Sequence, residues 1–255
     1  MSTRFAFWRK EVEEAFSEQE EHARPGVWSD FILGSQDGLV NVLAVLLGVA
    51  IASIQTAQDA SSAFRIILAA GLAATFGESI SMGAVAYTST LARRDHYLKE
   101  KEREMREMKD LPHVEREEVR TIFREWGYEG SELEEIVDRI IAKPKAWLEL
   151  MMAHELRLAP VAPEQARKSA ILVGIAAVVG SLIPLGPFIF FSIDLIAGII
   201  GALIVSAIAL FLIGWYKAKT TVGRPGRSGV QMVLIGILAA LAGFGIAYLV
   251  GVAGT

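Results

Sequence analysis

The chain alternates long apolar blocks with charged connections, and five of these blocks carry almost no charge. Their lengths fit helices that cross a bilayer, because about 20 residues in helical conformation span the hydrocarbon core. Strands are excluded by the length of the blocks and because an open sheet in lipid leaves backbone groups unpaired. The sequence therefore predicts five membrane-spanning helices, in residues 31–54, 64–91, 170–191, 195–216 and 230–252.

The longest charged stretch, residues 92–169, lies between the second and third apolar blocks and is here called the insert. Helical patterning runs on from the second block until Pro112 interrupts it. Ser131 and Glu134 have the spacing of a capping box, and Pro144 suits the first turn of a last helix. We therefore predict an all-α polytopic membrane protein with a small helical domain inserted between membrane helices 2 and 3.

Composition narrows the function classes. Hydrophobic residues make up 53% of the chain, which is too apolar for an ordinary soluble domain. The absence of cysteine excludes disulfides and thiolate metal sites. A formal net charge of −4 gives no basis for nucleic-acid binding. The first 30 residues lack the apolar core of a cleavable signal peptide, so we expect none.

The distribution of Lys and Arg predicts the orientation. Basic residues concentrate in the N-terminal arm, the insert and the fourth connection, whereas the first connection and the third, expected around residues 184–187, have none before the next block begins. The positive-inside rule then puts the arm and the insert in the cytoplasm and the C-terminus outside. No organelle signal is apparent, so we expect the cell membrane first and a vacuolar membrane second. The predicted division is a cytoplasmic amphipathic arm (1–30), membrane helices 1–2 (31–91), the cytoplasmic insert (92–169) and membrane helices 3–5 (170–255).

Acidic residues of the insert are spaced so that pairs share one helical face. Two pairs of glutamates stand three residues apart, and one further glutamate follows two adjacent methionines by one turn. Carboxylates bind divalent cations through oxygen, and thioethers favour later transition metals, so a mixed cluster suits Fe²⁺. The alternative is a solvated charged face with methionines filling the core. The residues concerned are Glu104, Glu107, Glu115, Glu118, Met151, Met152 and Glu155.

Two carboxylates lie within the apolar blocks. Asp37 and Glu78 are costly in lipid, so such groups usually face the bundle interior or a water path and mark an ion pathway. The alternative is a neutral carboxyl held by hydrogen bonds in a dry core. By depth and helical face, Asn41, Ser81 and Met82 would complete a polar track with these two acids.

Three segments resemble the vacuolar iron transporter family: "DFILGSQDGLVNVLAVLLGVA", "GESISMGAVAYTSTLARRDHYLKEKERE" and "KPKAWLELMMAHEL". The resemblance covers nearly the whole chain. It implies a homodimeric, proton-coupled exporter that moves Fe²⁺, sometimes Mn²⁺ or other divalent ions, out of the cytosol, with no enzymatic activity. It also implies an ion path between the first two helices of the two protomers.

The resemblance assigns roles to particular residues. It implies that Asp37 is the pore acid, Met82 the methionine of the SMG motif, and the insert glutamates and methionines a cytoplasmic metal site. One position departs from the pattern: the family's glutamate eight residues before that methionine is Ala74 here, and Glu78 stands four residues before it. The carboxylate has moved by one turn along the helix.

Two other functions remain open at this stage. A membrane-anchored iron-storage protein or ferroxidase would use the insert as its working part, although the insert lacks the Glu-x-x-His pairs usual in di-iron bundles. A metal sensor without transport would have no need of acids in the membrane.

Overall fold

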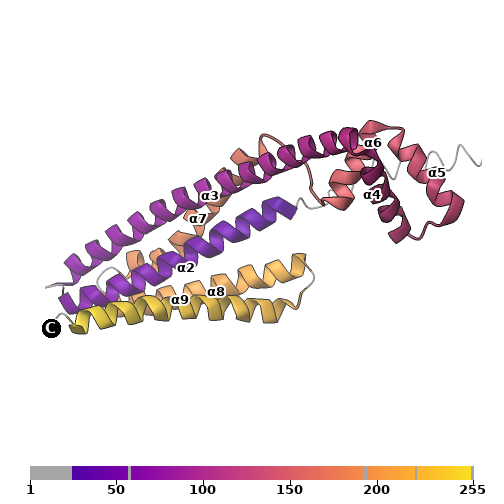
Figure 1. Ribbon diagram of the computed structural model, residues 1–255. Helices are drawn as coiled ribbons and strands as arrows, with labels where there is room; N and C mark the ends of the chain where they lie inside the picture. Colours follow the sequence, from indigo (N-terminus) through magenta and orange to yellow (C-terminus); the bar gives the residue numbers. More distant parts are fainter. Residues whose placement is uncertain (1–24, 57–58, 192–193, 222, 254–255) are drawn as a thin grey trace, which may run out of the picture.

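The computed structural model describes residues 25–56, 59–191, 194–221 and 223–253, and within these ranges every regular element is a helix. Five helices are long and apolar enough to cross a membrane, and they lie alongside one another as a bundle (Figure 1). The expected all-α fold with five helices of spanning length is confirmed. These helices are α2 (Pro25–Thr56), α3 (Ala60–Asp110), α7 (Gln165–Phe190), α8 (Leu195–Thr220) and α9 (Pro225–Ala253). The predicted arm, residues 1–30, lies mostly outside the described residues.

Helix α3 has 51 residues and extends well beyond the bundle (Figure 1). At 1.5 Å per residue it is about 75 Å long, more than twice the roughly 30 Å of a hydrocarbon core. Asp59 caps its start by accepting a hydrogen bond from the backbone N–H of Ser62 at 2.7 Å. At its end Leu111 N–H bonds to Glu107 O, and Pro112 begins the next helix. The predicted continuation of the second span up to Pro112 is confirmed.

The insert contains short helices at the far end of α3 (Figure 1). Their inward faces meet in a hydrophobic core that includes Val119, Val137, Trp147 and Met151. The insert therefore has a core separate from those of the membrane bundle. Its elements are α4 (Pro112–Glu125), α5 (Gly130–Ile141), α6 (Pro144–Leu150) and the π-helix η1 (Met151–Glu155).

The predicted capping box at Ser131 is wrong. The N-cap of α5 is Glu129, and no side chain caps it. Glu134 instead accepts hydrogen bonds from Arg120 on α4, with Nε to Oε1 at 2.7 Å. A charge-assisted pair between two helices has replaced the weaker local cap.

The third connection also lies later than predicted. Helix α7 continues through Pro184 and Pro187 to Phe190, and Phe191 N–H bonds to Pro187 O. Each proline loses only its own N–H bond, and membrane helices tolerate this where neighbouring helices pack against them. The chain therefore turns after Phe190, where Asp194 caps α8 through the N–H of Ala197 at 3.0 Å.

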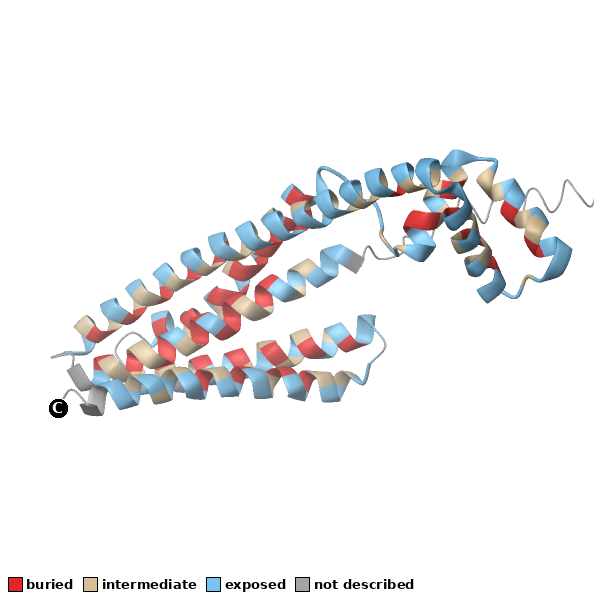
Figure 2. Ribbon diagram, in the orientation of Figure 1, coloured by how far each residue is buried: buried red, intermediate tan, exposed pale blue. Residues whose placement is uncertain are grey.

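Helix α7 packs against both α2 and α3, and the backbones approach closely where glycines face carbonyl groups. A Cβ on Gly180 would lie 2.0 Å from Ser35 O, and one on Gly34 would lie 2.4 Å from Val173 O. Such contacts are the usual basis of helix association in lipid. Figure 2 shows buried residues gathered along α2 and α7, while the outward faces of α3, α8 and α9 are exposed. Those faces carry large apolar side chains, as expected of a surface covered by acyl chains.

Gly180→Ala should destabilise the bundle by about 1–3 kcal/mol, because its new methyl group overlaps the Ser35 carbonyl. Gly186→Ala in the same helix is the matched control, since a Cβ there meets nothing within 4 Å. Thermal unfolding of both variants in detergent measures the difference. Equal transition midpoints would contradict the close α2–α7 packing.

Candidate metal sites

Three glutamates from three different elements converge in the insert. One carboxylate oxygen from each of Glu104, Glu115 and Glu155 lies within 4.8 Å of the others. Glu104 comes from α3, Glu115 from the first turn of α4, and Glu155 from the end of η1. A divalent cation bound by oxygen ligands needs this kind of arrangement.

The burial of two of these acids is the strongest feature of the site. Glu104 is 1% exposed and Glu115 is 4% exposed. Glu104 Oε1 and Glu115 Oε2 have no hydrogen-bond partner in the part of the chain that the structure describes. Buried charges are normally paired or coordinate metals, so these two oxygens are suited to a cation.

The other two predicted glutamates lie at the same cluster. Glu118 forms a hydrogen bond with Glu115, and the negative charge of Glu118 raises the pKa of Glu155. Glu107 lies near enough for its charge to act on Glu118, and it is held by Arg103 at 3.4 Å. The structure therefore gathers the five predicted glutamates of the insert, with Arg103 as a counter-ion at the rim.

Met151 and Met152 are both buried, at 0% and 3% exposure. Met151 belongs to the hydrophobic core of the insert, so it has a packing role whatever else it does. The backbone changes here from α to π, with Leu156 N–H bonding to Met151 O and Leu158 N–H bonding to Met152 O. This wider turn ends at Glu155, and π-turns are frequent at functional sites.

Crowding of like charges changes the acidity of the cluster. Burial, a hydrogen bond with Glu104 and neighbouring carboxylates raise the pKa of Glu115 to about 9. Partial burial and the charges of Glu118 and Glu104 raise the pKa of Glu155 to about 7. Partial burial, with the charge of Glu104, also raises the pKa of Glu118. Metal binding must therefore displace protons at neutral pH.

A second polar group lies between α2 and α3, half-buried along their apolar stretch. Asn41 Nδ2 donates to Glu78 Oε1 at 3.0 Å, and the Asp37 carboxyl lies within hydrogen-bonding reach of Glu78. Met82 is half-buried one turn after Glu78. Ser81 is exposed and has no recorded hydrogen bond to this group among the described residues. Of the five predicted track residues, the structure thus brings Asp37, Asn41 and Glu78 into contact.

Sequence reasoning passed over one acid on the same helix. Asp30 lies seven residues before Asp37, on a similar face of α2, and accepts a hydrogen bond from Ser169 Oγ on α7 at 2.6 Å. The spacing of seven was the available signal. Asp30 stands one residue before the predicted apolar block, which begins at Phe31.

Comparison with known proteins places this arrangement in a family. The sequence pattern of the VIT family matches residues 28–248, which is most of the chain and includes both polar groups. This chain belongs to the VIT family. The resemblance found in the sequence is therefore confirmed.

Named relatives align along nearly their whole length. A vacuolar iron transporter of Centaurea cyanus is 38% identical over 218 residues, which cover 86% of this chain and 85% of that protein. Vacuolar iron transporter 1 of Arabidopsis thaliana is 34% identical, with 91% of this chain and 89% of the relative covered. The vacuolar iron transporter of Plasmodium falciparum is 27% identical, with 84% and 78% covered.

At the position where this VIT-family chain departs from the expected glutamate, Ala74 packs against the hydrophobic core of the bundle. Glu78, one turn later, contacts Asn41 and Asp37 across the α2–α3 interface. The displaced carboxylate therefore lies at the level of Asp37.

The acidity of the insert predicts how its stability depends on pH. The pKa of Glu115 in the folded state lies above its ordinary 4.5, so the folded chain keeps a proton that the unfolded chain has lost. The metal-free insert should be most stable below about pH 4.5 and lose stability as the pH rises toward 9. Thermal unfolding of the metal-free protein between pH 5 and 9 measures this. Glu115→Gln should flatten the dependence, whereas Glu134→Gln, which removes an acid whose pKa Arg120 lowers, should not.

Proposed function

We propose that this protein exports divalent metal from the cytosol, Fe²⁺ first and Mn²⁺ as a second cargo, in exchange for protons. The observation that carries the proposal is the pair of buried carboxylates, Glu104 and Glu115, whose oxygens lack partners among the described residues. The names of the relatives, vacuolar iron transporters, support the same cargo.

The proposed first step is capture by the insert. Glu104, Glu115 and Glu155 would supply oxygen ligands, with Glu107 and Glu118 at the rim and Met151 and Met152 as candidate sulfur ligands. A set of carboxylates with a neighbouring thioether is chemically suited to Fe²⁺ and other transition metals more than to Mg²⁺.

The proposed second step is transfer into the membrane. Helix α3 carries both Glu104 and Glu78 in one continuous helix, so it links the capture site with the polar group at Asp37. Met82, and Asp30 on the insert side of Asp37, are further candidates for this path. Protons arriving from the far side would compete with metal for the same oxygens, which gives a simple coupling device.

The assembly and placement are part of the proposal. We expect a homodimer with the ion path between the α2 and α3 helices of two copies, a cytoplasmic insert and a C-terminus outside the cell membrane. The shared ion path is supported by polar groups that one copy leaves accessible, namely the exposed Asn41 and the half-buried Asp37 and Glu78. The orientation is supported by the basic residues in the connections on the insert side.

An iron-storage protein, a ferroxidase and a transporter would use the carboxylates of the insert and of the membrane helices differently. A ferroxidase or storage protein would turn over or retain iron at the insert without needing Asp37. His154, the histidine nearest the cluster in sequence, is exposed and packs its ring against Trp126 at 4.9 Å between ring centroids. This arrangement gives no support to a histidine ligand, and therefore favours transport over iron oxidation.

Asp37→Asn should reduce Fe²⁺ flux into proteoliposomes under a pH gradient by at least about tenfold, because it removes the charge that metal and proton share. Asp194→Asn is the matched control, since asparagine is also a good N-cap and should preserve α8. Full flux in Asp37→Asn would refute the pathway assignment.

Glu104→Gln should weaken metal binding to the full-length protein by roughly 10- to 100-fold, measured by anaerobic titration with Fe²⁺ or Co²⁺. Glu102→Gln, an exposed residue on the same helix, should leave the affinity unchanged. Oxidation of Fe²⁺ is followed in the same samples. Rapid turnover that survives Asp37→Asn would favour the ferroxidase.

A further inference from the structure

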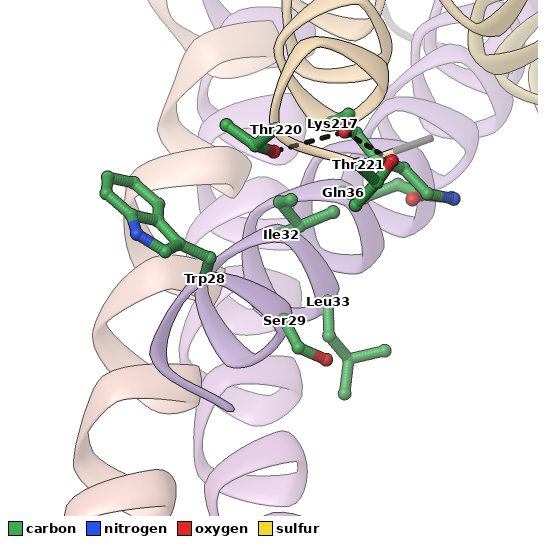
Figure 3. A pocket seen from close by; sticks show the side chains of 8 residues that line it. All are labelled: Trp28, Ser29, Ile32, Leu33, Gln36, Lys217, Thr220 and Thr221. Carbon is green, nitrogen blue, oxygen red and sulfur yellow. Dashed lines mark hydrogen bonds between the residues drawn. The ribbon is translucent and has the colours of Figure 1, made fainter. Parts of the chain in front are cut away.

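A groove of about 470 Å³ lies between the start of α2 and the end of α8 (Figure 3). Both helix ends lie on the same side of the bundle as the insert (Figure 1). It is separate from the metal sites, because its lining contains none of their residues.

The groove combines an apolar wall with unused hydrogen-bond donors. Ile32 and Leu33 of α2 supply the wall. The side-chain donors of Ser29, Gln36 and Lys217 lie beside it and have no hydrogen-bond partner in the described ranges. A ligand with an apolar part and an anionic part matches both kinds of surface.

The charged side chain that lines the groove is positive. Lys217 is the charged residue of its lining, and no described acid forms an ion pair with it. Asp30 follows the groove residue Ser29 in the sequence, but its carboxylate accepts a hydrogen bond from Ser169 on α7. Lys219 stacks over the Trp215 ring at 5.1 Å, and Arg224 follows at the same end of the bundle.

The two helix ends also favour an anion. The first turn of α2, which includes the groove residue Trp28, has backbone N–H groups without helical partners and the positive end of the helix dipole. The C-terminal carbonyl groups of α8 would oppose an anion. However, Thr220 and Thr221 both donate their hydroxyls to Lys217 O, at 3.1 and 2.8 Å, as Figure 3 shows.

An aromatic pair marks the depth of the groove. Trp28 of α2 and Tyr216 of α8 lie 5.3 Å apart between ring centroids and are tilted by 56°. Trp and Tyr concentrate at the headgroup level of bilayers, where their rings meet both lipid and water. The groove therefore lies where phospholipid headgroups lie.

We propose that this groove binds an anionic phospholipid from the leaflet on the insert side. The phosphate lies against Lys217 and Ser29, and an acyl chain follows Ile32 and Leu33 into the bilayer. The site ties the end of α8 to the start of α2. It does not depend on the metal cargo or on transport.

The test is native mass spectrometry of the delipidated full-length protein, titrated with phosphatidylglycerol or with phosphatidylcholine of the same acyl chains. Wild type should prefer phosphatidylglycerol by at least about fivefold, the contribution of one basic residue at a lipid surface. Lys217→Gln should lose that preference, whereas Lys219→Gln should keep it, because Lys219 lies over Trp215. Phosphatidylglycerol should also raise the thermal unfolding midpoint of wild type but not of Lys217→Gln.

Three further experiments identify the molecule that fills the groove. Ile32→Trp should fill the groove and reduce phosphatidylglycerol binding while leaving Lys217 in place. Inorganic phosphate should not displace the lipid, since it lacks the apolar part. An unchanged preference in Lys217→Gln would overturn the proposal. So would a large gain in lipid binding after removal of residues 1–24, because the N-terminal arm would then be the occupant.

Discussion

The proposed chemistry depends on carboxylates that lie close together with few neutralising partners. Glu104 and Glu115 are buried in the insert with oxygens that no described donor satisfies, and Asp37 and Glu78 meet half-buried between α2 and α3. Taking a carboxylate out of water is costly unless a proton or a cation neutralises it. Such a site is stable only with a proton or a metal bound, so it is suited to exchanging one for the other.

The scaffold that supports these groups is one long helix. Helix α3 runs along the bundle and continues into the insert, so Glu78 and Glu104 belong to one continuous helix. In the proposed transport, a displacement of the insert on binding metal would act directly on the end of this helix. Helix α7 packs against α2 at Gly180, which faces Ser35, and against α3 at Gly174, which faces Ser79, so it holds α3 beside α2.

The proposed lipid groove lies on another pair of helices. It joins α2 to the end of α8 on the insert side, whereas the polar group at Asp37 faces α3. If both proposals hold, helix α2 has a metal-facing side and a lipid-facing side. A headgroup bound by Lys217 would stabilise the position of α2 without contacting the ion path.

The sequence by itself determined the helical class, the five spanning helices and the continuation of α3 up to Pro112. These features follow from local quantities: the length of apolar blocks, the cost of unpaired backbone in lipid, and the loss of a donor at proline. Spacing also put Glu104 with Glu107 and Glu115 with Glu118 on shared helical faces, while the assignment of these residues and Glu155 to one metal site came from the family resemblance. Only the tertiary structure decided that pairs from different helices meet at one point and that Glu104 and Glu115 are buried there. It also decided that Glu134 bonds to Arg120 instead of capping α5, that α7 passes through two prolines, and that a π-turn ends at Glu155. Each of these depends on contacts between residues far apart in the chain, and helical periodicity carries no information about such contacts.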